Sequence, residues 1–283
     1  MSSSCNDILI KNIIECSADI ERCSAEIDLL VFESLLNKDF STCTVADIKS
    51  DVLQCYKEIK NLTVPSKYES ARQKVYICTK IAENVKIASH SDKLLDYNSH
   101  AVKISYWNSN RYAKEAFVRF SKLFNKFEEI HVESFNAVCE SISDEYTLGI
   151  VPIVNSTDGK LTSFYRLIDK FDLKILSTCN VENLNSDGFT RLALVGKKIL
   201  SFKNESTKHI ELLITEKISD FVMVTELMGG SVKEITSIPS PYNKNEALNY
   251  ISINLSVNKI HIAWWYWYIF GGDIDLLGLY TEI

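Results

Sequence analysis

Residues 147–159, Thr-Leu-Gly-Ile-Val-Pro-Ile-Val-Asn-Ser-Thr-Asp-Gly, decide how the middle of this 283-residue chain folds. The first seven, 147–153, form a near-continuous apolar run, and the turn-forming residues Asn, Ser, Asp and Gly follow. An apolar run of this length that ends in a turn is typical of a strand buried on both faces. Such strands occur in α/β layers, so residues 147–153 predict a buried strand of that kind.

The segments around this strand continue an alternation of strands and helices. Strand patterns lie at 102–106, 129–132, 173–176 and 190–195, and helical patterns lie at 112–124, 134–141 and 161–170. This order predicts an α/β domain with parallel strands over residues 102–200.

From residue 201 the order changes to strand, helix, strand, strand, helix, strand. The expected strands are 210–215, 232–239, 247–255 and 274–280, and the expected helices are 220–228 and 259–270. This is the order of the ferredoxin-like unit, so residues 201–283 predict an α+β domain of that type.

Residues 1–89 predict an all-helical domain, and the polar stretch 90–101 predicts a linker after it. The first 89 residues contain no glycine, and apolar residues recur at three- and four-residue steps. Three helices are expected, at about 3–34, 45–60 and 66–88. Thr44 can cap the second helix, with Asp47 as its capping-box partner.

Charge and composition exclude several classes of function. The chain carries 31 Lys and Arg against 37 Asp and Glu, a net charge of −6, so no bulk electrostatic attraction favours nucleic acid or anionic lipid. Its most apolar run, 260–270, is far shorter than the roughly 20 residues of a spanning helix. The N-terminus has no signal-peptide pattern. These features predict a cytoplasmic protein with no membrane or nucleic-acid partner.

The cysteines and histidines give no sign of a metal site or cofactor. None of the eight cysteines forms a Cys-x-x-Cys pair, and the five histidines are scattered. Without a secretion signal the cysteines are expected to be reduced thiols that pack as small hydrophobes, although an even count also allows disulfides. Only six of the cationic residues are arginines, the preferred ligands of carboxylates, so an anion site has few candidates.

The run Trp-Trp-Tyr-Trp-Tyr at 264–268 is the most unusual local feature. On a helix of 3.6 residues per turn, these rings cannot all face one sheet. They either pack also against the neighbouring domain or form a dimer interface, where Trp and Tyr are enriched. The dimer is the favoured interpretation.

The C-terminal two thirds of the chain resembles the prephenate dehydratase family. Residues 148–159 resemble its signature, in which a buried strand ends in a Pro-Ile-Glu-Asn-Ser-Thr-like turn. Residues 133–138 and 180–192 fit two further motifs, the second with Thr-Arg-Leu for the family's Thr-Arg-Phe. Residues 234–239 and 277–280 are similar to the ACT domain that follows in most such enzymes.

This resemblance implies a role for five residues. Thr190 would be the catalytic acid that protonates the leaving group. Substrate would be bound by Asn155, Ser156, Thr157 and Arg191.

Three departures from the family predict that dehydratase activity is lost. The family's second lobe should stand between Lys174 and Asn180, where this chain has only five residues. Val154 replaces the glutamate of the signature, and Trp-Asn-Ser-Asn at 107–110 replaces a Gly-rich turn. A cleft with one lobe cannot exclude water, which weakens the hydrogen bonds on which catalysis depends.

The helical domain is similar to the chorismate mutase that precedes the dehydratase in bifunctional enzymes. Residues 45–53 are similar to the opening of its second helix, and the order of the three modules matches. A mutase must place cations on the two carboxylates and the ether oxygen of chorismate. Here lysines and acidic residues stand where the family has arginines. The resemblance places the catalytic residues at Lys11, Lys38, Asp47, Asp51 and Asn84.

Two functions remain open at this level. The favoured one is a divergent chorismate mutase/prephenate dehydratase-family protein of the aromatic amino acid branch, which converts chorismate to prephenate in its helical domain. The alternative is a catalytically inactive protein that binds an aromatic metabolite or a partner enzyme and regulates. Chorismate, prephenate or an aromatic amino acid is the expected ligand, and a homodimer through the ACT-like and helical domains is the expected assembly.

Overall fold

The computed structural model describes residues 44–62, 67–84, 94–95, 100–157, 159–183, 187–200, 207–214, 218–239, 247–271 and 274–283. Lys11, Lys38 and the expected helix at 3–34 lie outside these residues. The chain divides into two compact units. The first is helical, and the second holds the strands.

Helix α2 (Val45–Leu62) of the first unit begins at the predicted capping box. The Thr44 hydroxyl accepts a hydrogen bond from the Asp47 backbone N–H at 3.2 Å. Asp47 Oδ2 in turn accepts from the Thr44 N–H at 3.0 Å and from its hydroxyl at 2.6 Å. Helix α3 (Lys67–Asn84) follows, so two of the three expected helices are described.

Most of a further described helix, α8 (Ile260–Phe270), belongs to this unit, and it carries the aromatic run. Trp265 is fully buried, and Trp264 stacks on Tyr268 with the ring centroids 5.2 Å apart. Lys49 of α2 lies 4.7 Å from the centroid of the Tyr268 ring, and Lys74 of α3 lies 5.6 Å from that of Phe270. The run therefore contacts the helical region of its own chain, and the dimer interface stays a prediction.

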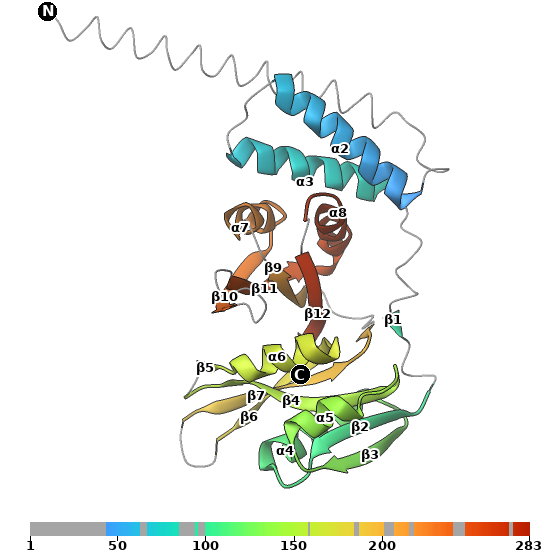
Figure 1. Cartoon of the computed structure of the whole chain (residues 1–283), viewed down its shortest axis with the longest axis vertical. Coiled ribbons are helices and arrows are strands. Elements are labelled where there is room, and N and C mark those ends of the chain that lie inside the picture. Colours follow the sequence, from blue (N-terminus) through green and yellow to red (C-terminus); the bar gives the residue numbers. More distant parts are fainter. Residues whose placement is uncertain are drawn as a thin grey trace, which may run out of the picture. The chain divides into compact units, whose positions relative to one another are not determined.

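The second unit is built on one long sheet (Figure 1). Nine strands follow one another in the order β10-β11-β9-β12-β6-β7-β4-β2-β3. Their bounds are β2 Val102–Trp107, β3 Phe127–Val132, β4 Thr147–Asn155, β6 Lys174–Glu182, β7 Phe189–Gly196, β9 Thr207–Ile214, β10 Ser231–Pro239, β11 Ala247–Ser256 and β12 Ile274–Glu282. Two-residue β5 (Gly159–Lys160) pairs with β4, and β1 (Leu94–Leu95) pairs with β8 (Ile199–Leu200).

The helices of the second unit lie on both faces of this sheet. They are α4 Arg111–Phe120, α5 Phe135–Ser141, α6 Thr162–Phe171 and α7 Ile218–Leu227, with the short 3-10 helices η3 Ser121–Leu123 and η4 Val257–Lys259. Helix α4 packs on one face with the apolar side chains of β2, β4, β6 and β7. Helices α5 and α6 pack on the other face, in a core that also takes in β10, β11 and β12.

The expectation of parallel strands throughout residues 102–200 is wrong at β7. Strand β2 runs parallel to β3 and β4, but β7 runs antiparallel to both β4 and β6. The reason is the length of the connection, because only six residues, 183–188, separate β6 from β7. A parallel pair needs a crossover of a dozen residues or more, so a short connection forces an antiparallel hairpin.

The ferredoxin-like order predicted for the C-terminal part is confirmed. Along the chain the elements run β9-α7-β10-β11-α8-β12. Strand β12 pairs antiparallel with β9 on one side and parallel with β6 on the other. At that junction Gly278 lies opposite Ile175, and a Cβ on Gly278 would come within 2.7 Å of the Ile175 Cβ. A glycine is therefore needed where the two halves of the sheet meet.

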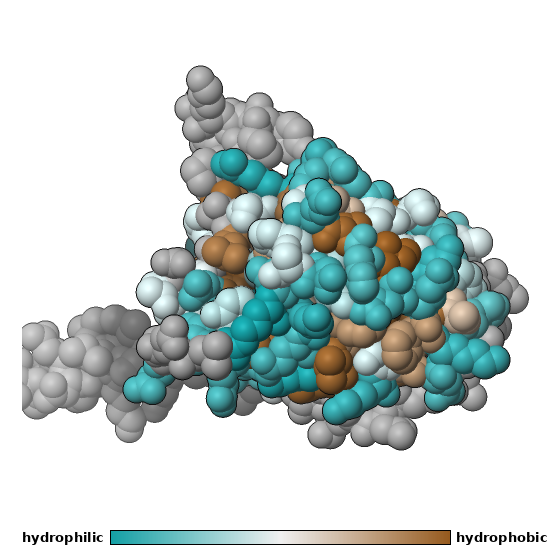
Figure 2. Space-filling view, turned by 90° about the horizontal axis from the view of Figure 1, so that it is seen from below, coloured by the Kyte–Doolittle hydropathy of each residue, from teal (hydrophilic) through white to brown (hydrophobic). Residues whose placement is uncertain are grey.

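Several large apolar side chains of the described residues are exposed, among them Tyr68, Val118 and Phe127. The face seen in Figure 2 is mostly hydrophilic, and its hydrophobic residues gather in small groups. No described helix is both long and apolar enough to cross a bilayer. Cys78, Cys139 and Cys179 are buried and free, and burial raises the pKa of all three thiols.

Candidate functional site

The residues assigned to the dehydratase-like cleft meet at one end of the sheet. Strand β4 ends beside the start of β7, where Asn155 pairs with Thr190. Strand β6 ends on the other side of β7, where Asn180 pairs with Arg191. Sequence segments about 30 residues apart converge here because both neighbouring strands run antiparallel to β7.

The polar groups of Asn155 and Ser156, in the turn after β4, form hydrogen bonds to neighbouring backbone groups. Asn155 Oδ1 accepts a hydrogen bond from the Thr157 N–H at 3.0 Å, which closes an Asx-type turn. The Ser156 hydroxyl accepts from the Phe189 N–H at 2.9 Å, and the Ser156 N–H donates to the Phe189 carbonyl at 2.9 Å. This turn thus holds the start of β7 in place.

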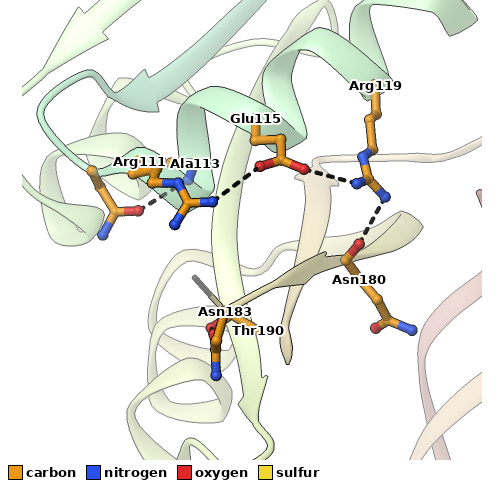
Figure 3. A network of polar contacts seen from close by, with 8 residues as sticks. Arg111, Ala113, Glu115, Arg119, Asn180, Asn183 and Thr190 are labelled. Atoms are coloured by element: carbon orange, nitrogen blue, oxygen red, sulfur yellow. Dashed lines mark hydrogen bonds and ion pairs between the residues drawn. The ribbon is translucent and has the colours of Figure 1, made fainter. Parts of the chain in front are cut away.

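Thr190 is buried, with 7% of its surface exposed. Its hydroxyl donates to Asn183 Oδ1 at 3.4 Å, a long hydrogen bond (Figure 3). Side chains alternate along a strand, so Thr190 shares the face of Leu192 and Leu194, which pack with α4. The expected catalytic hydroxyl therefore lies on the α4 side of the sheet.

Arg191 lies on the opposite face, with Ala193 and Val195. Its Nε donates to Asn180 Oδ1 at 2.9 Å, and one terminal nitrogen lies 3.2 Å from Glu282 Oε1. Asn180 Nδ2 donates to the same Glu282 oxygen at 2.6 Å. The three side chains form a closed ring that joins β6, β7 and β12. Two donors converge there on one carboxylate oxygen, an arrangement suited to binding a carboxylate.

A second polar network, on α4, was missed from the sequence. Glu115 lies between Arg111, at 3.9 Å, and Arg119, at 2.8 Å (Figure 3). Arg119 also donates to the backbone carbonyl of Asn180 at 2.7 Å. The i, i+4 spacing of Arg, Glu and Arg was the available signal. Two of the chain's six arginines therefore contact Asn180 near the end of β6: Arg119 binds its carbonyl and Arg191 binds its side chain.

The Asn180 carbonyl is accessible to Arg119 because the pairing of β12 with β6 ends before it. The Ile283 N–H donates to the Thr178 carbonyl at 2.9 Å, and no residue of β12 pairs beyond Thr178. Carbonyls two residues apart on a strand point to the same side. The Asn180 carbonyl therefore lies just past the end of β12, where Arg119 reaches it.

The turn that replaces the family's Gly-rich loop serves as a helix cap. Asn110 has extended backbone angles, and its Oδ1 accepts from the Ala113 N–H at 3.0 Å, which caps α4. Residues 107–110 thus start a helix with a side-chain acceptor.

The mutase-like candidates that the structure describes are dispersed along α2 and α3. Asp47 is engaged in the capping box, and Asp51 lies one turn further along α2. Asn84 is the last residue of α3. Arg72, on α3, has a side chain 68% exposed and lies 4.0 Å from Glu69. Among the described residues, these positions form no cluster of cations.

An open pocket lies away from the expected residues, at the other end of β6. It encloses about 310 Å³, counting its open side, and is lined by Tyr165, Ile168, Asp169, Asp172, Leu173, Lys174, Leu213, Tyr250, Asp275 and Leu277. Lys174 lies seven positions along β6 from Val181, the partner of Thr190, which is roughly 23 Å of strand. In the described part of the chain, no group of three His, Cys, Asp or Glu residues is arranged to hold a metal ion.

Comparison with known proteins gives a likeness of fold. No family model matches the sequence, and no curated protein matches it. Prephenate dehydratase from Streptococcus mutans is 17% identical with a TM-score of 0.51, over 64% of this chain and 100% of that chain. The dehydratase from Staphylococcus aureus subsp. aureus Mu50 is 10% identical with a TM-score of 0.48, over 63% and 100% of the two chains.

A third structure, the dehydratase from Arthrobacter aurescens in complex with L-Phe, is 12% identical with a TM-score of 0.48, over 64% of this chain and 90% of that chain. Identities this low establish no activity. The likeness to the Streptococcus mutans enzyme shows that this chain has a divergent prephenate dehydratase-like fold.

Proposed function

We propose that this chain binds a carboxylated ring metabolite of the chorismate–prephenate branch without dehydrating it, and that it serves as a regulatory binding protein. Chorismate, prephenate and the aromatic amino acids all carry a carboxylate. The observation that carries the proposal is the pair of donors from Arg191 and Asn180, which converge on one carboxylate oxygen at the end of the sheet. Charge-assisted hydrogen bonds of this kind are among the strongest in proteins.

The placement of Thr190 and Arg191 argues against dehydration. Adjacent residues of a strand point to opposite faces, so the hydroxyl of Thr190 and the guanidinium of Arg191 do not face a common ligand. Strand β6 runs without interruption from Lys174 to Glu182, so no second lobe is inserted there. The Arg191 side chain is 34% exposed, and a site this open cannot exclude water. Binding needs donors alone, whereas elimination of water and carbon dioxide needs an enclosed site.

The test is calorimetric titration of the purified protein with prephenate, chorismate and phenylalanine, together with an assay for phenylpyruvate. We expect saturable binding of at least one ligand and no phenylpyruvate. Arg191→Met should weaken binding roughly 10- to 100-fold, while the control Arg166→Met, on the exposed face of α6, should leave it unchanged. Phenylpyruvate formation would contradict the loss of dehydration, and absence of binding by all three ligands would contradict the proposal.

Chorismate rearrangement in the helical region is the second candidate. It is supported by α2, which begins at Val45, the first residue of the mutase-like segment 45–53, directly after the cap residue Thr44. Its test is loss of chorismate with prephenate as the product. Activity abolished by Lys11→Ala or Lys38→Ala would establish a mutase, and absence of turnover would contradict one. Because Arg191 lies in the other unit, Arg191→Met separates the two candidates.

A further inference from the structure

We infer that Glu282 is a built-in competitor that occupies the carboxylate site of Arg191 and Asn180, so that the ACT-like half controls access to it. This inference rests on the function proposed above and concerns the regulation of the same site. The donors come from β6 and β7 of the dehydratase-like half, whereas Glu282 comes from β12 of the ACT-like half. An internal side chain thus stands where a ligand carboxylate would bind.

The geometry matches that of a bound carboxylate. Glu282 Oε1 accepts from Asn180 Nδ2 at 2.6 Å and lies 3.2 Å from the Arg191 terminal nitrogen. Arg191 is itself oriented by its Nε, which donates to Asn180 Oδ1 at 2.9 Å. The two donors are therefore fixed by each other and by the β6–β7 pairing, whatever carboxylate they hold. A guanidinium and an amide fixed in this way need no rearrangement to accept another carboxylate.

The contact is suited to exchange. The side chains of Arg191 and Glu282 are 34% and 32% exposed, so solvent reaches the ion pair and a ligand can approach. Partly exposed ion pairs contribute little to stability, so displacing Glu282 does not unfold the protein. A tethered carboxylate nevertheless has a high effective concentration, which lowers the apparent affinity for a free one. The apparent affinity is reduced by the fraction of molecules whose site is closed.

The register of β12 places this competitor. Glu282 pairs with Thr178, and Gly278 pairs with Ile175 on the same strand. The pairing of β12 with β6 changes register between Gly278 and Thr281, so the end of β12 is set by an irregular segment. A ligand or partner that shifts β12 along β6 moves the carboxylate away from Arg191. The position of β12 along β6 would thereby determine whether Glu282 occupies the carboxylate site.

The experiment compares the binding of prephenate to four proteins by calorimetry: the unmodified chain, two variants of Glu282 and a control. Glu282→Gln removes the charge and keeps the shape, and Glu282→Asp keeps the charge but shortens its reach. We expect both to bind prephenate about tenfold more tightly than the unmodified chain, as for a site that is closed in about nine molecules of ten. Glu182→Gln is the control, because Glu182 is an exposed carboxylate two residues along β6 from Asn180. The affinity of Glu182→Gln for prephenate should stay within about twofold of that of the unmodified chain.

The outcomes separate this inference from the proposed function. Equal affinity of the unmodified chain, Glu282→Gln and Glu282→Asp would overturn the inference and leave the proposed function intact. An equal gain in affinity for prephenate in Glu282→Gln and Glu182→Gln would also overturn it. The gain would then come from the lower negative charge of the protein and not from emptying the site of Arg191 and Asn180. Absence of prephenate binding in every variant, Glu282→Gln included, would overturn this inference, and absence of chorismate and phenylalanine binding as well would overturn both. Thermal unfolding of each variant establishes that it is folded.

Discussion

The Tyr165 hydroxyl on α6 donates a hydrogen bond to Glu211 on β9 at 3.0 Å, inside the core shared by the two halves of the sheet. Glu211 is only 3% exposed, and its second oxygen accepts from the Tyr280 hydroxyl at 3.4 Å. A buried carboxylate is costly unless hydrogen bonds replace its water. The two tyrosines therefore make this acidic residue tolerable in an apolar core.

Removal of the Tyr165 hydroxyl should destabilise the fold. In Tyr165→Phe the buried carboxylate of Glu211 loses the 3.0 Å hydrogen bond from the Tyr165 hydroxyl. This loss should lower the free energy of unfolding by about 1–3 kcal/mol. Urea unfolding followed by circular dichroism measures this change. Tyr112→Phe, at a half-buried tyrosine of the same unit, serves as the control and should change the stability by less than about 0.5 kcal/mol. Equal effects of the two substitutions would contradict the role given to Glu211.

Gly278 should not tolerate a side chain. In Gly278→Ala the new Cβ would lie 2.7 Å from the Ile175 Cβ and 2.9 Å from its carbonyl oxygen. Overpacking of this kind costs about 1–3 kcal/mol, so the melting temperature should fall. Hydrogen exchange should locate the damage at β12 and β6, with α4 protected as before. Unchanged protection of β12 would show that the two strands do not meet as described.

Stability should decrease at alkaline pH because of buried thiols. Burial raises the pKa of Cys139 and of Cys179 from 9.0 to about 11. Between these values the unfolded thiols ionise while the folded ones stay protonated, so the unfolded state binds fewer protons and unfolding becomes easier as pH rises. The stability that the two buried thiols contribute to the folded state is fully present below about pH 9 and is lost as the pH rises towards 11. Urea midpoints between about pH 7 and pH 11 measure it, and a Cys139→Ala/Cys179→Ala variant should show a shallower decline.

Of two neighbouring substitutions, Arg191→Met and Thr190→Val, only the first should weaken ligand binding. Arg191→Met removes a charge-assisted donor worth about 1.5–3 kcal/mol, or roughly 10- to 100-fold in affinity for prephenate. Thr190→Val removes a hydroxyl that is buried on the other face and donates to Asn183, so it should leave affinity unchanged. Calorimetry on the two variants decides the matter, and a loss of binding in Thr190→Val would place the ligand on the α4 side.

Local patterns in the sequence predicted much of the fold. The capping box of Thr44 and Asp47, the apolar strand at 147–153 and the ferredoxin-like order follow from spacing alone, because each depends on nearby residues. The direction of β7 was missed, although the six-residue connection before it determines that direction. The junction of β12 with β6 depends on a pairing across about 100 residues, and its only local sign is Gly278.

The candidate site was predicted in part. The turn after β4 and the start of β7 were expected to meet, and Asn155 and Thr190 do lie opposite each other. Strand alternation alone places Arg191 on the face of the sheet opposite to Thr190. No local pattern in the sequence predicts the contact of Arg191 with Glu282. The contact exists only because β12 pairs with β6 in one particular register. Long-range register is the information that a single sequence does not display.

The continuous sheet has a consequence for how the second unit comes apart. Deleting residues 201–283 would uncover the edge of β6, whose backbone groups now pair with β12, together with apolar side chains that now contact Tyr250 and Leu277. An exposed strand edge beside bare apolar surface promotes aggregation. The dehydratase-like half is therefore not expected to survive as a separate soluble fragment. Its unfolding should be a single cooperative transition shared with the ACT-like half.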